Sequence, residues 1–212
     1  MPDQRDDPDF AFEPIPGLPE RPPAGEEILW QGRPATLPLA RAAFKLDWIA
    51  AYFAALVAWH FATATAAGGL LAGLAHGLPY AVLGAAGLGV VLGLAHAQAR
   101  AAIYTVTSAR VILRVGAALP VTFNIPFAQV MAARLNERGD GTGTITLQTP
   151  EETRLAYAAL WPHARPWHFR NPEPALRAIP GAARVAALVA DAAETRINTP
   201  VLGPQPAAIA AE

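Results

Sequence analysis

One apolar stretch, residues 46–99, constrains this chain more than any other feature. It contains no Lys or Arg, and its only formal charge is Asp47 at the start. Two apolar runs, 48–67 and 78–97, lie inside it on either side of a Gly-rich break. Each run is close to the ~20 apolar residues that a helix needs to cross a ~30 Å hydrocarbon core. The stretch therefore predicts a two-span transmembrane hairpin, with the lipid bilayer as its surroundings.

Cationic residues flank the expected hairpin at its two ends and are missing from its turn. Arg41 and Lys45 precede the first run and Arg100 and Arg110 follow the second, whereas the connecting loop, 68–77, carries no Lys or Arg. Cytoplasmic flanks of membrane helices are enriched in these cations, so both termini are expected in the cytoplasm and the protein in a bacterial inner membrane. The acidic N-terminus shows no apolar segment after a basic start, so no signal peptide is expected.

Composition excludes several function classes. The net charge is −1 and no basic run is present, so no nucleic-acid partner is expected. The absence of Cys excludes disulfides, thiolate metal sites and a Cys nucleophile. Residues 138–143, RGDGTG, lack the Lys and the following helix of a phosphate-binding loop and are interpreted as a hairpin turn. No G-x-S-x-G or H-E-x-x-H motif occurs, so the chain is not expected to be an enzyme or to hold a metal.

The rest of the chain divides into four segments by composition. Residues 1–25 form an acidic, Pro-rich segment that is either a disordered tail or an extended strap docked on the folded part. Residues 26–45 contain a short strand and a lead-in to the membrane, residues 100–196 a folded domain, and residues 197–212 a flexible tail.

Short β-branched runs separated by turns fill the domain after the apolar stretch. Such spacing is typical of an antiparallel sheet that curls or pairs with a second sheet, as a sandwich or barrel. The predicted strands are 26–31, 102–106, 110–115, 121–125, 129–135, 143–148 and 153–159, followed by one amphipathic helix, 182–194. The predicted fold class is thus an α+β membrane protein with a helix-capped antiparallel sheet. Because one strand precedes the hairpin, the hairpin is expected to be inserted within a single fold.

Small residues recur at every fourth position in both apolar runs, where they would let helices approach closely. They are Ala50, Ala54, Ala58, Ala62 and Ala66 in the first run, and Ala81, Ala85, Gly89, Gly93 and Ala97 in the second. One interpretation is two packing faces, one within the hairpin and one for a partner helix or a second copy in a homodimer. The alternative is chance, because the chain is rich in Ala throughout.

Two further groups are candidate binding residues. His60 lies deep in the first apolar run, where an imidazole is either a ligand, for example of a bacteriochlorophyll magnesium, or a hydrogen-bonding group between helices. The connector 161–170, WPHARPWHFR, is dense in aromatic and cationic residues. Its candidate partner-binding residues are Trp161, His163, Arg165, Trp167 and Phe169. These rings either form a binding surface or pack under the sheet.

Several phrases resemble a known family. YTVTSARVILRVG at 104–116 and EILWQGRP at 27–34 resemble bacterial membrane-anchored pleckstrin-homology-like (PH-like) domains. FEPIPGLPE at 12–20, LPVTFNIPF at 119–127, LWPHARPW at 160–167 and PALRAIP at 174–180 resemble one branch, the PuhB-type photosynthetic-complex assembly proteins of purple bacteria.

The resemblance implies a PH-like domain and an assembly factor that acts by protein–protein contacts. Its expected partners are subunits of the photosynthetic reaction centre and, indirectly, the core light-harvesting antenna. The family supplies no catalytic residues and no cofactor. A bacteriochlorophyll-binding or pigment-delivery protein, with His60 as axial ligand, is the alternative.

Overall fold

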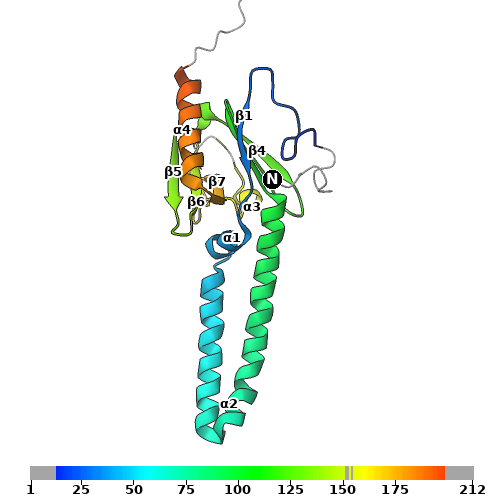
Figure 1. The fold of residues 1–212 in the computed structure, drawn as a ribbon, viewed down its shortest axis with the longest axis vertical. Helices are drawn as coiled ribbons and strands as arrows, with labels where there is room; N and C mark the ends of the chain where they lie inside the picture. Colours follow the sequence, from blue (N-terminus) through cyan, green and yellow to red (C-terminus); the bar gives the residue numbers. More distant parts are fainter. Residues whose placement is uncertain (1–12, 151–152, 154, 199–212) are drawn as a thin grey trace, which may run out of the picture.

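The chain folds into a β domain from which one long helix projects (Figure 1). This computed structural model describes residues 13–150, 153 and 155–198. The projecting helix is α2, Leu46–Ala101, and it is preceded by the short helix α1, Thr36–Ala43.

Helix α2 is folded in two at Gly69, where φ is 80° and ψ is −178°. This backbone conformation is open to Gly and strained for other residues, so the fold-back requires Gly at this position. The rings of His60 and Tyr80 stack with centroids 3.9 Å apart. Along a straight helix they would be separated by about 30 Å, so the two arms, 46–68 and 70–101, lie side by side (Figure 1).

The structure corrects the expected description of the apolar stretch. Residues 68–77 are helical apart from Gly69, whereas the sequence predicted a loop between two separate helices. Among the described residues, α2 is the one helix long and apolar enough to cross a membrane, with a mean hydropathy of 1.9 over an 18-residue window. It is therefore one candidate membrane helix and not two helices joined by a Gly-rich loop.

Two antiparallel sheets form the β domain, as the turn spacing predicted. The first has the order β1-β2-β3-β4 and the second the order β5-β6-β7. The bounds are β1 Ile28–Gly32, β2 Ile103–Thr107, β3 Arg110–Val115, β4 Val121–Pro126, β5 Ala132–Glu137, β6 Thr142–Gln148 and β7 Ala175–Pro180. Because β1 pairs with β2, with Trp30 opposite Val106, α2 is inserted between two neighbouring strands of one fold. This insertion confirms the expectation from the early strand.

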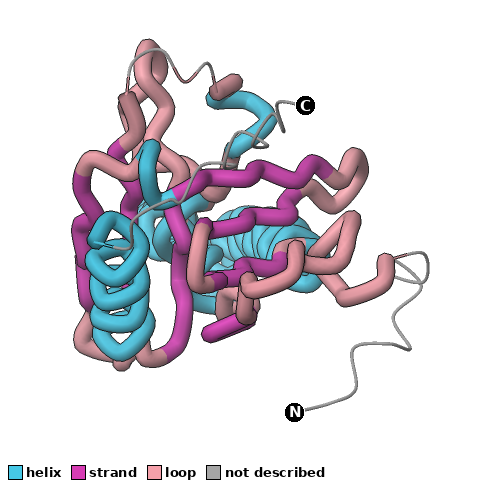
Figure 2. Tube along the Cα trace, turned by 90° about the horizontal axis from the view of Figure 1, so that it is seen from above, coloured by secondary structure: helices cyan, strands magenta, loops and turns pink. Residues whose placement is uncertain are grey.

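Helix α4, Ala182–Asn198, covers the two sheets and closes the core (Figure 2). Its Val185 and Val189 are 2% and 1% exposed and pack in one cluster with Leu113 of the first sheet and Ile145 of the second. The amphipathic pattern of 182–194 therefore predicted this helix correctly, because one face is apolar and the other is polar.

Three local features differ from the sequence-based expectations. The predicted strand 153–159 is wrong: in its described part the chain forms the single-turn helix α3, Tyr157–Leu160. Strand β7 and helix α1 were not predicted. The strand predicted at 129–135 begins later, after the 3-10 turn η3, Phe127–Gln129. The expected tail, 199–212, lies outside the described residues, as do residues 1–12.

The described part of the N-terminal segment lies on the first sheet. Leu18 is 2% exposed, and Gly17, at φ +85°, lies so close to Ile103 that an added Cβ would come within 2.6 Å of that side chain. Arg114 of β3 donates to the Glu13 carboxylate at 3.0 Å, and the Gln31 amide donates to the Pro16 carbonyl at 2.9 Å. These contacts fix residues 13–18 against strands β1 to β3.

Candidate functional site

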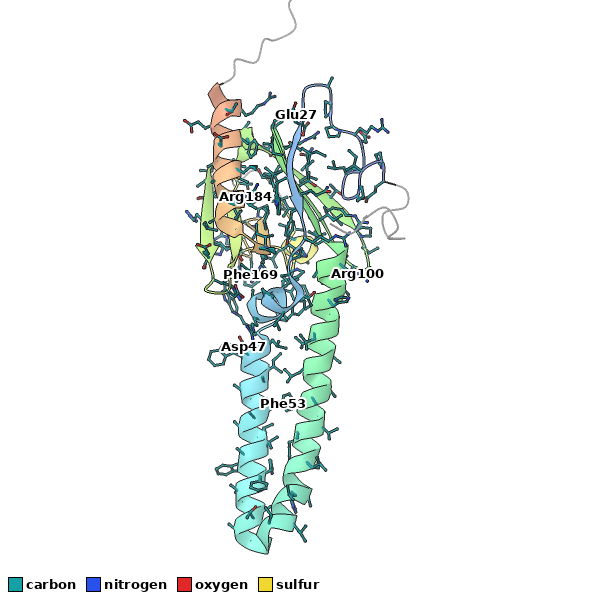
Figure 3. All side chains as sticks on the ribbon, viewed as in Figure 1. Glu27, Asp47, Phe53, Arg100, Phe169 and Arg184 are labelled. Carbon is teal, nitrogen blue, oxygen red and sulfur yellow. The ribbon has the colours of Figure 1, made fainter. Side chains whose placement is uncertain are left out.

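The connector 161–170 forms an exposed aromatic loop at the end of the β domain from which α2 projects. Phe169 of this loop lies in the part of the β domain toward the start of α2 (Figure 3). Trp161 contacts Phe44 edge-on, with ring centroids 5.2 Å apart, and Phe44 lies between α1 and α2. Trp167 and Phe169 are 79% and 59% exposed, and their centroids are 6.1 Å apart. We call Phe44, Tyr157, Trp161, Trp167 and Phe169 the aromatic rim.

The loop is fixed to the domain by a buried pair, His163 and Tyr104. The Tyr104 hydroxyl lies 2.6 Å from Nδ1 of His163 and accepts the backbone N–H of Arg177 at 3.3 Å. We assign the hydroxyl hydrogen to Nδ1, so that the proton of the neutral ring is on Nε2, which is buried without a hydrogen-bond partner. Burial, together with the charge of Arg177, lowers the pKa of His163 to about 3. The ring is thus a neutral structural group.

Arg177 of β7 connects three segments at this end of the domain. Arg177 is 6% exposed, and its guanidinium donates to the carbonyls of Pro162 at 3.0 Å and Ala42 at 2.9 Å. Ala42 belongs to the last turn of α1, so one side chain joins β7, the aromatic loop and the segment that enters α2. Its Nε is buried without a hydrogen-bond partner, and no carboxylate among the described residues forms an ion pair with Arg177. Burial lowers the pKa of Arg177.

Further cations gather beside the aromatic rim. Arg165 donates to Glu173 at 2.8 Å, and Arg134 approaches the other oxygen of the same carboxylate at 3.9 Å. A cavity of about 740 Å³ opens here, bounded by α1, strands β5 and β6 and the aromatic loop. The basic residues that line it are Lys45, Arg134, Arg138, Arg165 and Arg177, with His168 beside them, and Glu137 is its one acidic lining residue.

A second cavity, of about 350 Å³, continues the first. The two share Lys45, Trp167 and Arg177 in their walls. The second cavity is bounded mainly by the aromatic rim, through Tyr157, Trp161, Trp167 and Phe169. Together the cavities form one groove that is cationic at one end and aromatic at the other.

The predicted residues of the connector fall into two groups. Trp161, Trp167 and Phe169 are on the surface, so the alternative in which the rings pack under the sheet is wrong for these three. His163 and Arg165 hold the loop, through Tyr104 and Glu173 respectively. Sequence reasoning missed Lys45 and Arg177. The signal for Arg177 was a lone cation inside the apolar run ALRAIP, 175–180.

The small-residue stripes do not make the contact between the two arms of α2. An added Cβ at Gly89 or Gly93 would meet nothing within 4 Å, so both face away from the other arm. Three other glycines take the contact: Gly84 lies against Phe53, with an added Cβ 2.8 Å away, and Gly73 and Gly77 lie against Phe61. The expectation that one stripe packs within the hairpin is therefore wrong, and the 81–97 stripe, exposed in all five members, is an open face.

His60 lies between the two arms, where one face of its ring is covered by Tyr80 at an interplanar angle of 9°. This contact explains the position of the side chain without a ligand. Among the described residues, no group of three or more His, Asp and Glu is arranged to hold a metal ion.

Comparisons with known proteins place the chain among its relatives. A family model described as "Bacterial PH domain" matches residues 44–193. A Rhodobacter capsulatus protein described as an uncharacterized 23.7 kDa protein in the puhA 5′ region is 49% identical over 207 residues, which cover 97% of each chain. No solved structure matches.

Proposed function

The chain belongs to the bacterial PH domain family, and from this premise we propose that it is a membrane-anchored assembly factor of the photosynthetic reaction centre. The near-full-length relative is encoded beside puhA in a purple bacterium, which suggests a photosynthesis gene-cluster context. The resemblance of residues 12–20 and 160–167 to PuhB-type proteins points in the same direction. In this proposal the protein acts through protein–protein contacts and not as an enzyme.

The proposed topology follows from the fold-back of α2. A helix folded in two leaves the membrane on the side from which it entered, so the β domain stays on one side. Arm 46–68 is about 34 Å long and arm 70–101 about 48 Å, and each is sufficient for a ~30 Å core. The cations Arg41, Lys45 and Arg100 at the domain end favour the cytoplasmic side for the β domain.

The observation that carries the proposal is the open face of the second arm. Its five small residues, at 81, 85, 89, 93 and 97, are exposed, while other glycines make the arm-to-arm contact. In lipid, helices associate where small residues allow close backbone approach, because apolar side chains gain nothing over lipid tails. We infer that this face receives a membrane helix of a reaction-centre subunit during assembly.

A crosslinking experiment in a photosynthetic purple bacterium tests the proposal. A photoreactive amino acid is placed at Gly89, where nothing lies within 4 Å of an added Cβ, in a tagged full-length chain. The matched control position is Leu94, which is 52% exposed on the same arm but lies outside the stripe. We expect crosslinks from Gly89 to reaction-centre subunits during assembly and fewer from Leu94. Equal yields from both positions, or no reaction-centre subunit in either product, would refute the proposal.

Because the chain has no Cys, labelling of single Cys residues tests the topology separately. Leu70→Cys, next to the fold-back, should react with a membrane-impermeant maleimide from the periplasmic side. Leu119→Cys, which is 80% exposed on the β domain, should react only after the cells are opened. Labelling of Leu119→Cys in intact cells would contradict the topology.

A further inference from the structure

The groove beside the start of α2 combines an aromatic surface with a cationic cavity at the level where the chain would enter the membrane. Lys45, the residue before α2, lines both cavities, and Phe169 lines the smaller one with it. Trp48 and Tyr52, in the first turns of α2, are 77% and 60% exposed. Trp and Tyr are enriched at this depth because their rings are amphipathic. If α2 is in the membrane, the aromatic rim therefore lies at the headgroup region of the same leaflet.

Charge selects the chemistry of an occupant. Five basic side chains and one acidic side chain line the larger cavity, and Glu173 neutralises part of this excess through Arg165 and Arg134. Lys45 adds charge without an ion pair among the described residues, and Arg138, near the β5–β6 turn, adds charge that the nearby Asp140 offsets in part. An anion in the cavity is thus favoured over a neutral or cationic group.

Arg177 gives an independent reason for an anion. Its guanidinium is nearly fully buried in the wall shared by the two cavities, and it is held by carbonyl oxygens alone among the described residues. A buried charge without a countercharge is costly, and Nε also lacks a hydrogen-bond acceptor. A negative group in the adjoining cavity would supply the missing countercharge.

We propose that this groove binds the phosphodiester headgroup of an anionic phospholipid from the leaflet into which α2 inserts, with the glycerol and upper acyl region against the aromatic rim. The occupant is a lipid and not a free phosphate because the cationic cavity continues into an aromatic one that faces the membrane end of the domain. Basic pockets beside membrane helices on the cytoplasmic side are known to suit such headgroups. This inference needs α2 in the membrane, but it does not depend on any contact with a reaction centre.

Native mass spectrometry of the detergent-purified full-length chain tests the proposal. Phosphatidylglycerol and phosphatidylcholine with identical acyl chains are titrated separately, and the bound fraction is measured. We expect phosphatidylglycerol to bind about tenfold more tightly, which corresponds to about 1.4 kcal/mol. Equal retention of the two lipids would overturn the proposal.

Two double variants identify the site. Arg134→Ala with Arg138→Ala removes two cations that line the larger cavity, and we expect this double variant to lose the preference for phosphatidylglycerol. Arg184→Ala with Arg196→Ala removes the same charge from exposed positions on α4 and should leave the preference unchanged. Equal losses in both double variants would show a general charge effect and no site. Thermal melting of each variant in detergent confirms that the fold is kept.

Two further arms exclude other occupants. Inorganic phosphate at millimolar concentration should not displace bound phosphatidylglycerol, and displacement would show a free-phosphate site instead. Brominated lipid should quench less fluorescence in Trp167→Phe than in the unchanged protein, because Trp167 is placed at the headgroup region. The same quenching in both proteins would overturn the membrane placement of the aromatic rim. So would crosslinks to protein alone from a photoreactive amino acid placed at position 167.

Discussion

Acidification should destabilise the β domain through one side chain, His163. The imidazole is 0% exposed and accepts the Tyr104 hydroxyl at Nδ1, so the folded state requires its neutral form. Its pKa is lowered from 6.5 to about 3 in the fold, first by burial and then by the charge of Arg177. The unfolded chain binds a proton below pH 6.5 that the folded chain binds only near pH 3. Stability is therefore complete above pH 6.5 and falls as the pH decreases through this window.

The size of the effect follows from the shift. Each unit of pKa difference is worth about 1.4 kcal/mol, so the free energy of unfolding should fall by about 2 kcal/mol between pH 7 and pH 5. The carboxyl groups whose pKa values are lowered in the fold titrate below this pH window. Burial raises the pKa of Glu26, but the hydrogen bonds of Arg110 and Thr107 and the charges of Arg110 and Arg196 together lower it below its usual 4.5. The stability that this carboxylate contributes is therefore lost only at more acid pH. The window from pH 7 to pH 5 thus isolates His163 among the described groups with shifted pKa values.

Chemical unfolding in detergent, followed by circular dichroism at pH 7, 6 and 5, measures this slope. The comparison is His163→Asn, which cannot titrate. This variant will be less stable at pH 7 because the Tyr104 contact changes, but its stability should be nearly flat over the window. The informative quantity is the difference in slope and not the stability itself. A flat profile for the unchanged protein, or the same slope in His163→Asn, would refute the assignment of a buried neutral imidazole.

Four substitutions test other parts of the structure by thermal or chemical unfolding. Gly84→Val should destabilise the contact between the arms of α2 because an added Cβ lies 2.8 Å from Phe53, whereas Gly93→Val, with nothing within 4 Å, should leave it unchanged; equal effects would contradict the assigned faces. Arg177→Met should lower the free energy of unfolding by about 2–4 kcal/mol through lost hydrogen bonds to three carbonyls. An unchanged value would show that these hydrogen bonds do not stabilise the fold. Ile145→Ala, at a fully buried position, should lower it by about 2–5 kcal/mol, and a loss under 1 kcal/mol would place this residue outside the core.

Local patterns predicted the elements whose period is set by one buried face. The alternation in 144–148 gave β6, and the apolar stripe of 182–194 gave α4, because burial on one side imposes a period of two in a strand and 3.6 in a helix. Strand β7, ALRAIP, was missed because all of its residues except Pro180 are buried, so no alternation is visible, and because it lacks the run of β-branched residues that identified the equally buried β2. The single turn α3 is too short to show any period.

The candidate site was harder to predict because it is assembled from distant segments. The connector was found from its own aromatic residues, but Lys45 and Arg177 join it through the tertiary fold. The small-residue stripes show a second limit. A four-residue spacing identifies a face that permits close approach, but it does not say which neighbour takes that face. The contact between the arms instead depends on Phe53 and Phe61 meeting isolated glycines, and no spacing rule signals such pairs.

Two buried arginines tie the β domain to α2, one at each end of the helix. Arg177 binds the Ala42 carbonyl at the end of α1, just before α2 begins, and Arg114 donates at 3.0 Å to the carbonyl of Ala101, the last residue of α2. A cation at a helix C-terminus is stabilised by the partial negative charge of its free carbonyls. Arg114 also binds Glu13, so the N-terminal segment is held at the same point. With both ends fixed, the domain cannot swing freely about its membrane helix. The aromatic rim and the open face of the second arm are then held in a set relation, as a scaffold that positions a lipid and a protein partner would require.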